Sequence, residues 1–368
     1  MTKKVIAIIS VLKPVDDTRN FEKVASSISN TNKYEINIIG FSAKKVPLHQ
    51  NIVFHPVFNF RRISLSRFLL PLKVWGILIK LKPELIIVTC AELLIVSVTH
   101  KILFGSKIIY DIQENYYRNI LYSGAYPILL KYPIAWTVRC IEKIACIFID
   151  RIILAEKIYE SQLKFVTKKS IVLENKALIP TEIFSDGFDT DKEIVLVYSG
   201  TIAEHYGIFD AIAFVKRLHE SVKKIKLIII GYASQVNIQK KLIAETEKDD
   251  YIEIIGNDRL VPHDQILMTI NQSSMCILPY ARNKSTEGRI PTKVFECLAM
   301  EKPVIISSNP AWNSIIKKNN AGIIYDFESQ DEFDIMLLQG KFYGNNLSFQ
   351  YTWESNSIAI IKLVVELI

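Results

Sequence analysis

Short apolar runs alternate with helical patterns along this chain, and that alternation restricts it to a layered α/β fold. At the start, Val5–Leu12 reads as a buried strand, Asn20–Ser29 as a helix and Tyr34–Ile39 as the next strand. Strands separated by helices pair in parallel, so this opening predicts a doubly wound sheet. Further strands are expected at Leu85–Val88, Lys107–Tyr110, Asp150–Ala155, Ile171–Leu173, Ile194–Tyr198, Lys226–Ile230, Tyr251–Ile255, Met275–Pro279 and Val304–Ile306.

The length of 368 residues suits two domains, and the charge changes sign between them. Residues 1–180 hold 26 Lys and Arg against 13 Asp and Glu, whereas residues 181–368 hold 19 against 25. A polar stretch, PTEIFSDGFDTDKE, lies at the change. We therefore predict one domain over residues 1–180, a second over 190–350, and a terminal helix over 351–368.

The basic excess of the first domain predicts an anionic partner. Aromatic residues do not alternate with arginines as an RNA-binding surface would require, so we favour an anionic membrane surface over nucleic acid. The pattern over Ile63–Lys82 is helical, basic and aromatic, and Tyr122–Ile149 is a core helix or, alternatively, a second membrane-facing stretch.

Several other classes are disfavoured. No G-x-G-x-x-G occurs, which argues against a nicotinamide dehydrogenase. The five cysteines have no C-x-x-C, so they predict reduced thiols in a cytoplasmic protein. Asp189 and Asp191 have a D-x-D spacing that some metal sites use, but they lie in the polar connection, and we interpret them as linker. We expect no metal and no cofactor.

The segment from Ile290 to Ile306 carries the clearest chemical signal. Ile290-Pro291 breaks the chain, a helical pattern follows, and Val304–Ile306 is a short buried run. Lys293 falls in the first turn of that helix and Glu296 one turn later. Backbone N–H groups and Lys293 can meet phosphate there, and Glu296 can accept two ribose hydroxyls. Alternatively, the two residues form an ordinary surface ion pair at (i, i+3).

The strings PTKVFE, LAM and KPVI in this segment resemble the donor-site motif of GT-B glycosyltransferases of the glycosyltransferase 4-like group, also called group 1. The resemblance implies that Glu296 holds the ribose and that Lys293 contacts the diphosphate. The family's other glutamate would fall on Gly288, with Glu287 one residue away. The implied fold is GT-B, two Rossmann-like domains facing across a cleft. Trp353-Glu354 resembles the family's closing segment, whose helix packs back toward the first domain.

The first domain holds the expected acceptor side. Asp17 and Arg19, in DDTRNFEKVA, resemble the opening of a family subgroup, although Asp17 can simply cap a helix. Asp111 and Glu114 come directly after a strand, where an α/β enzyme keeps its chemistry. Their run resembles an acceptor-side Asp-x-His-Glu loop with Gln113 in place of histidine. A glutamine can bond a sugar hydroxyl but cannot take a proton. The candidate catalytic residues are Lys293, Glu114 and Asp111.

The loop after the first strand of the second domain also departs from the family. Gly200 lets the backbone approach a phosphate. The arginine and lysine usual in the family are replaced here by Thr201 and Tyr206, and His205 or Arg289 is the expected substitute for the missing charge. The candidate donor-binding residues are Gly200, Thr201, His205, Tyr232, Arg289, Lys293 and Glu296.

We therefore expect a glycosyltransferase that moves a sugar from a nucleotide-sugar donor to a lipid-linked or polysaccharide-precursor acceptor. The resemblance implies retention of anomeric configuration without a metal. From the reduced thiols and the basic first domain we expect a cytoplasmic protein, peripheral on the inner face of the cytoplasmic membrane. One alternative is a sugar-nucleotide 2-epimerase of the same fold. Another is a catalytically silent GT-B partner subunit, which the missing charges after Gly200 favour.

Overall fold

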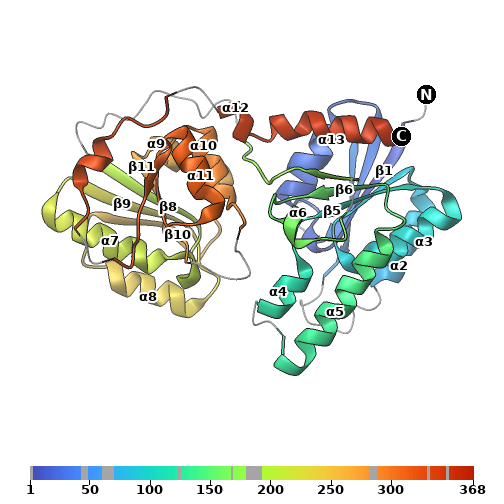
Figure 1. Ribbon diagram of the computed structural model, residues 1–368, viewed down its shortest axis with the longest axis horizontal. Coiled ribbons are helices and arrows are strands. Elements are labelled where there is room, and N and C mark those ends of the chain that lie inside the picture. The colour runs from blue at the N-terminus through green and yellow to red at the C-terminus, as the bar shows by residue number, and fades with distance from the viewer. Residues whose placement is uncertain are drawn as a thin grey trace. The chain divides into compact units, whose positions relative to one another are not determined.

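The computed structural model describes residues 3–42, 49–59, 70–122, 126–166, 169–179, 193–281, 288–329, 332–344 and 348–368. Its contacts divide the chain into two compact units (Figure 1). Unit 1 comprises Met1–Asn175 and Trp353–Ile368, and unit 2 comprises Lys176–Thr352. Asp189 and Asp191 lie outside the described residues, as do Glu287 and residues 60–69 of the basic pattern.

Unit 1 is built on a parallel sheet of seven strands in the order β3-β2-β1-β4-β5-β6-β7. The strands are β1 (Lys4–Pro14), β2 (Tyr34–Phe41), β3 (Ile52–Phe58), β4 (Leu85–Val88), β5 (Lys107–Ile112), β6 (Arg151–Leu154) and β7 (Ser170–Val172). The helical elements are η1 (Thr18–Ala25), α1 (Ser26–Ser29), α2 (Leu70–Leu81), η3 (Ala91–Leu93), α3 (Leu94–Phe104), α4 (Tyr116–Tyr122), α5 (Ile128–Ala145), α6 (Tyr159–Gln162) and α13 (Glu354–Leu367).

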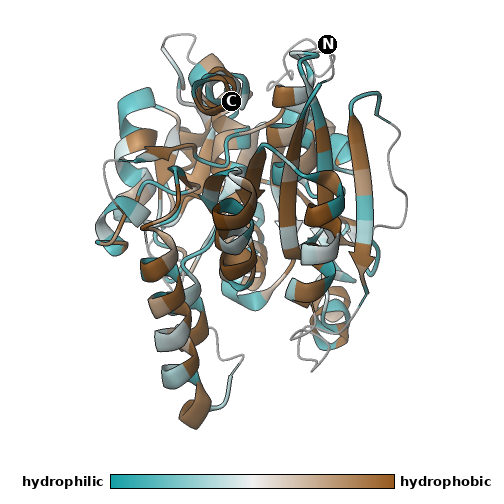
Figure 2. Cartoon of the chain, turned by 90° about the vertical axis from the view of Figure 1, so that its right-hand side faces the viewer, coloured by the Kyte–Doolittle hydropathy of each residue, from teal (hydrophilic) through white to brown (hydrophobic). Residues whose placement is uncertain are grey.

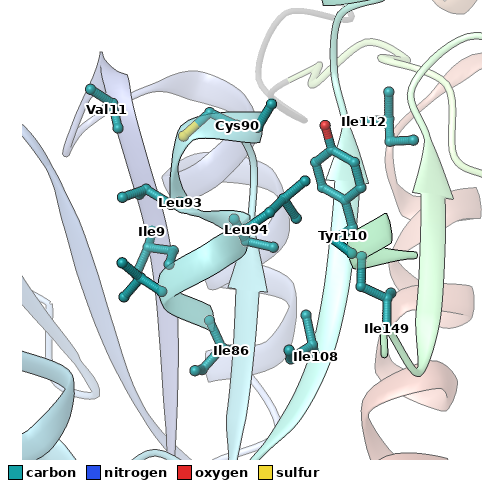
Figure 3. Close-up of a cluster of buried hydrophobic side chains, with 14 of the residues drawn as sticks. Ile9, Val11, Ile86, Cys90, Leu93, Leu94, Ile108, Tyr110, Ile112 and Ile149 are labelled. Carbon is teal, nitrogen blue, oxygen red and sulfur yellow. The ribbon is translucent and has the colours of Figure 1, made fainter. Parts of the chain in front are cut away.

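One face of this sheet packs against α2, α3 and α5. Ile9 and Val11 of β1 point to the same side as Ile86 of β4, because alternate residues of a strand share a face. Figure 3 shows these side chains packed around Leu94 of α3. On the other side, η1, α1 and α13 contact one another, and Trp353 Nε1 donates to Ser27 Oγ at 2.9 Å and to the Lys23 carbonyl at 3.2 Å. The final helix is thus held within unit 1.

Unit 2 has a parallel sheet of six strands in the order β10-β9-β8-β11-β12-β13. The strands are β8 (Ile194–Thr201), β9 (Ile225–Tyr232), β10 (Ile252–Asn257), β11 (Met275–Leu278), β12 (Val304–Ile306) and β13 (Gly322–Ile324). The helical elements are η5 (Glu204–Tyr206), α7 (Ile208–Ser221), α8 (Val236–Thr246), α9 (His263–Gln272), α10 (Thr292–Ala299), α11 (Pro310–Asn319), η6 (Ile335–Gln339) and α12 (Ser348–Tyr351). Helices cover both faces, as two separate buried clusters show.

The predicted doubly wound class is therefore correct, with differences in detail. The alternation did not indicate β3 or β13; the exposed and half-buried positions of β3 lack the continuous apolar run of a central strand. Of the helical pattern over Ile63–Lys82, the structure describes α2 from Leu70, with Pro71 in its first turn, where proline is tolerated; residues 63–69 lie outside the described ranges. Within the described ranges no helix is long and apolar enough to cross a membrane, and no cluster of three His, Cys, Asp or Glu side chains suits a metal ion.

Candidate functional site

The strand order of unit 2 reverses between β8 and β11. From β8 the chain moves outward through β9 to β10, then returns to the other side of β8 and continues through β11, β12 and β13. In open α/β sheets, ligands bind outside the carboxyl ends of the strands at such a switch point. The residues of interest here are Gly200 at the end of β8 and the first turn of α10, which follows β11.

Glu296 of α10 is the charged centre of this site. Its Oε2 atom lies 2.6 Å from Lys293 Nζ, and its Oε1 atom lies 3.1 Å from His263 Nε2 at the start of α9. The Glu296 side chain is 3% exposed, that of Lys293 16% and that of His263 42%. A buried carboxylate is therefore approached by two nitrogen donors that remain partly accessible.

The pKa of Glu296 reflects this environment. Burial alone would raise it, but the charge of Lys293 and the hydrogen bond from His263 outweigh burial and lower the pKa to about 2. Glu296 is thus an anion at neutral pH. Each carboxylate oxygen has two lone pairs, so both oxygens can accept a further hydrogen bond from a ligand hydroxyl.

Lys293 also contacts the end of β8. A Cβ atom built on Gly200 would lie 2.9 Å from Lys293 Cε, and Gly200 has φ +105°, a conformation that favours glycine. Glycine at this position therefore leaves room for the lysine side chain. The arrangement brings Gly200, Lys293 and Glu296 of the predicted donor set together, and adds His263.

The other predicted donor residues surround this centre less directly. Thr201 ends β8, is exposed, and is paired in register with the half-buried Tyr232 of β9. His205 is exposed, and its ring lies 4.1 Å from that of Tyr206. Arg289 is half-buried and lies three residues before α10.

Tyr206 occupies the place where the resembled family has a lysine. Its ring packs edge-on against Tyr280, with centroids 5.9 Å apart, and Tyr280 in turn packs against Trp312. An aromatic contact has replaced a cation here. Lys293 is consequently the cation that the described residues place against both Gly200 and Glu296.

Residues 180–335 match the family model described as glycosyl transferases group 1. This part of the chain is therefore similar to the group 1 glycosyltransferases. The resemblance seen in the PTKVFE segment is therefore confirmed. No curated protein matches the sequence closely enough to count as a relative.

Solved structures extend the likeness over the whole chain. Sucrose-phosphate synthase from Thermosynechococcus elongatus aligns with a TM-score of 0.69 at 14% identity, covering 99% of both chains. Anabaena HepE, in complex with UDP and glucose, aligns with a TM-score of 0.61 at 12% identity, again covering 99% of both. The lipopolysaccharide outer core galactosyltransferase WaaB aligns with a TM-score of 0.58 at 15% identity, covering 96% of this chain and 99% of that one. These matches confirm the predicted GT-B fold.

Unit 1 lies outside the residues that match the family model, and it joins Arg19, Asp111 and Gln113 of the predicted acceptor side in one hydrogen-bonded network. Arg19 pairs with Asp111 in a bidentate arrangement, Nε to Oδ2 at 2.9 Å and Nη2 to Oδ1 at 2.8 Å, and Nη2 also donates to the Leu173 carbonyl at 3.0 Å. Arg19 and Asp111 are 5% and 1% exposed. Such a pair is held by its own hydrogen bonds, which favours a positioning role for Asp111 over direct catalysis.

Gln113 is oriented by this pair. Its Nε2 atom donates to Asp111 Oδ2 at 3.0 Å and to Asn20 Oδ1 at 2.8 Å. A carboxylate only accepts hydrogen bonds, so the amide nitrogen must face Asp111, and Gln113 Oε1 is left as an acceptor toward a ligand. Asp17 accepts from the N–H groups of Arg19 and Asn20 and thereby caps η1, as its capping interpretation predicts.

Glu114 is separate from this network; its Oε2 atom accepts from Asn119 Nδ2 at 2.7 Å. Sequence reasoning missed His263 and Asn20. His263 begins a helix after the carboxyl end of β10, and that placement is the signal that would have found it. Asn20 was assigned only to a helix, and nothing in its spacing indicates that it would bond Gln113.

Proposed function

We propose that the protein transfers a sugar from a nucleotide-sugar donor to a lipid-linked or polysaccharide-precursor acceptor, with retention of anomeric configuration and without a metal ion. The observation that supports it most strongly is the placement of Lys293 and Glu296 beside Gly200 at the switch point of unit 2, within the residues that match the group 1 glycosyltransferase model. Similar structures in complex with UDP and glucose or with UDP-2-fluoro glucose support a nucleotide-sugar donor.

In this proposal the acceptor hydroxyl oxygen bonds to the anomeric carbon and loses its proton. The bond from that carbon to the donor phosphate oxygen breaks, and the nucleoside diphosphate leaves with the electron pair. Negative charge therefore grows on the diphosphate during the reaction. Lys293 and the N-terminal end of α10 stabilise that charge more in the transition state than in the ground state.

Glu296 has a binding role in this scheme. Ribose hydroxyls donate to its two oxygens, and Lys293 moves from the carboxylate toward the diphosphate when the donor arrives. The neighbouring His263 keeps Glu296 oriented during that exchange. Thr201, Tyr232, His205 and Arg289 form the surrounding donor-side surface. On the acceptor side, Gln113 Oε1 accepts from a sugar hydroxyl, and Glu114 is the remaining candidate for the acceptor proton.

The deciding experiment separates binding from transfer. Thermal-shift measurements with UDP-, GDP-, dTDP- and CMP-sugars identify the donor, because a ligand that binds only the folded state stabilises it by mass action. The preferred donor is then incubated with lipid-linked and soluble acceptors, with and without EDTA, and NMR gives the anomeric configuration of the product. Absence of stabilisation by every nucleotide sugar would exclude the donor site.

The same experiment tests two other functions. Turnover of UDP-N-acetylglucosamine alone, without acceptor, would indicate a 2-epimerase. Tight donor binding with no transfer to any acceptor would favour a silent partner subunit, a possibility supported by the aromatic packing of Tyr206 where the family has a lysine.

A further inference from the structure

The outer face of α5 is apolar, although its side chains are exposed. Leu129 is 88% exposed, Trp136 68% and Ile144 63%, and Tyr132 is also exposed. At 100° per residue these side chains fall within about a third of the helix circumference. The opposite side of α5 carries Ala135, Val138 and Ile141 toward the core of unit 1. Figure 1 shows α5 extending below the sheet, and Figure 2 shows brown, hydrophobic residues reaching its tip.

Two neighbouring helices continue this surface. α3 contacts α5, and α2 contacts α3. Each has large apolar side chains on its exposed side: Leu72 and Ile79 on α2, and Ile95, Ile102, Leu103 and Phe104 on α3. A surface helix of a globular protein ordinarily turns polar residues outward, and a helix that is apolar on both sides meets a second apolar phase.

The charges on the same helices are almost all of one sign. α2, α3, α4 and α5 carry seven basic residues, Lys73, Lys80, Lys101, Arg118, Lys131, Arg139 and Lys143. Their single acidic residue, Glu142, is 1% exposed and pairs with Arg139. Lys101 pairs with Asp150, whereas Lys73, Lys80 and Lys143 are exposed. The exposed surface therefore combines large apolar side chains with the positive charge of these three lysines.

We infer that this surface, formed by the outer sides of α2, α3 and α5, inserts shallowly into a bilayer that contains anionic lipid. Apolar side chains enter the interface, Trp136 and Tyr132 sit at headgroup level, and the lysines meet lipid phosphates. A second copy of the chain would satisfy the apolar groups, but a two-fold contact would place like charges opposite one another. Charge complementarity therefore favours an anionic lipid surface over a second copy of the chain. The inference deepens the proposed function and rests on it for the lipid-linked acceptor that such docking would bring within reach.

The test uses the full chain and vesicles of phosphatidylcholine with or without phosphatidylglycerol. Wild type should sediment with the anionic vesicles, and the fluorescence of Trp136 should shift to shorter wavelength; Trp75, Trp312 and Trp353 are half-buried or buried. Leu129→Ser combined with Trp136→Ser should reduce partitioning at least about tenfold, the scale expected for losing two inserted side chains. The matched control is Ile358→Ser combined with Val365→Ser, which removes two exposed apolar residues from α13 and should leave partitioning unchanged.

Equal losses of vesicle partitioning in the α5 and α13 double variants would overturn the inference. Equal binding of wild type to neutral and anionic vesicles would also overturn it. A dimer of wild type that dissociates in the α5 variant, without vesicle binding, would assign the surface to a second copy and also overturn it. Calorimetry with UDP is run on every variant. For wild type, UDP binding without binding to anionic vesicles refutes only the membrane surface, whereas vesicle binding without UDP binding refutes only the donor site. In the α5 variant, retained UDP binding shows that the loss of vesicle binding does not come from unfolding.

Discussion

Lys293 lies directly against Gly200, so that a Cβ atom at position 200 would fall 2.9 Å from Lys293 Cε. The two residues are far apart in the sequence and come from different elements, the end of β8 and the start of α10. The glycine is required twice, once by its φ of +105° and once by the room that the lysine occupies. The absence of a side chain at position 200 therefore helps to place the cation of the donor site.

Gly200→Ala should accordingly weaken donor binding and destabilise the fold by roughly 1–3 kcal/mol, the cost of holding a non-glycine residue in a sparsely populated conformation. Urea denaturation and calorimetry with the donor measure the two effects. Gly76→Ala is the matched control, because no atom lies within 4 Å of a Cβ built there and the residue is exposed in α2. That change should be neutral or stabilise by up to about 1 kcal/mol. Donor affinity equal to wild type in Gly200→Ala would argue against the lysine contact.

Lys293→Ala should reduce kcat/KM by an amount that corresponds to roughly 2–4 kcal/mol of lost transition-state stabilisation. This is the scale of losing one preorganised electrostatic contact to a leaving group. Glu296→Ala should act mainly on donor binding, because ribose contacts change little during transfer. Lys317→Ala, an exposed lysine of α11, is the control and should change neither quantity. Steady-state kinetics with calorimetry distinguish the effects, and unaltered turnover in both site variants would place the donor site elsewhere.

The stability of unit 2 should depend on pH through Glu296. Its pKa is about 2 in the folded protein against an ordinary value of 4.5. A carboxyl group whose pKa is lower in the folded protein stabilises the fold fully at pH values above its unfolded-state pKa. This stabilisation is lost as the pH falls toward the folded-state pKa. The contribution is on the order of 3 kcal/mol near neutral pH and should disappear between about pH 4.5 and 2.

The measurement compares the free energy of unfolding of wild type and Glu296→Gln from pH 7 to pH 2. The difference should be constant above about pH 5 and shrink at lower pH. A difference that stays constant down to pH 2 would show that Lys293 and His263 do not hold the carboxylate in its ionised form.

The sequence predicted some features of the fold and of the candidate site and missed others, for physical reasons. The doubly wound class and the Lys293–Glu296 pair follow from local patterns, because strand alternation and an (i, i+3) spacing on one helix are local properties. The contacts of His263 with Glu296 and of Lys293 with Gly200 join elements that meet only when the sheet forms. No pattern in one sequence specifies such pairs.

Unit 1 illustrates the same limit. The sequence indicated both Arg19 and Asp111 as candidate site residues but did not predict that they pair with each other, 92 residues apart. Because of this bidentate pair, we interpret the two side chains as a buried support and not as ligand contacts. The exposed apolar face of α5 was likewise hidden, because residues of both faces are apolar and the sequence alone gives no burial. The core interpretation describes the buried side of that helix, and the membrane interpretation remains a proposal for the exposed side.

Asp111→Asn should destabilise unit 1 by roughly 3–5 kcal/mol, because it leaves the guanidinium of Arg19 buried without its counter-charge. Burial disfavours the charged form of Arg19, but Asp111 reverses this and raises the pKa of Arg19, so the arginine cannot escape the cost by losing its proton. The matched control is Glu193→Gln, which removes an exposed ion pair with Lys226 and should cost no more than about 1 kcal/mol. Chemical denaturation of both variants gives the comparison. If Asp111→Asn unfolds at the same denaturant concentration as the control, the Arg19 pair is not a support, and direct contact of Asp111 with the acceptor becomes the better interpretation.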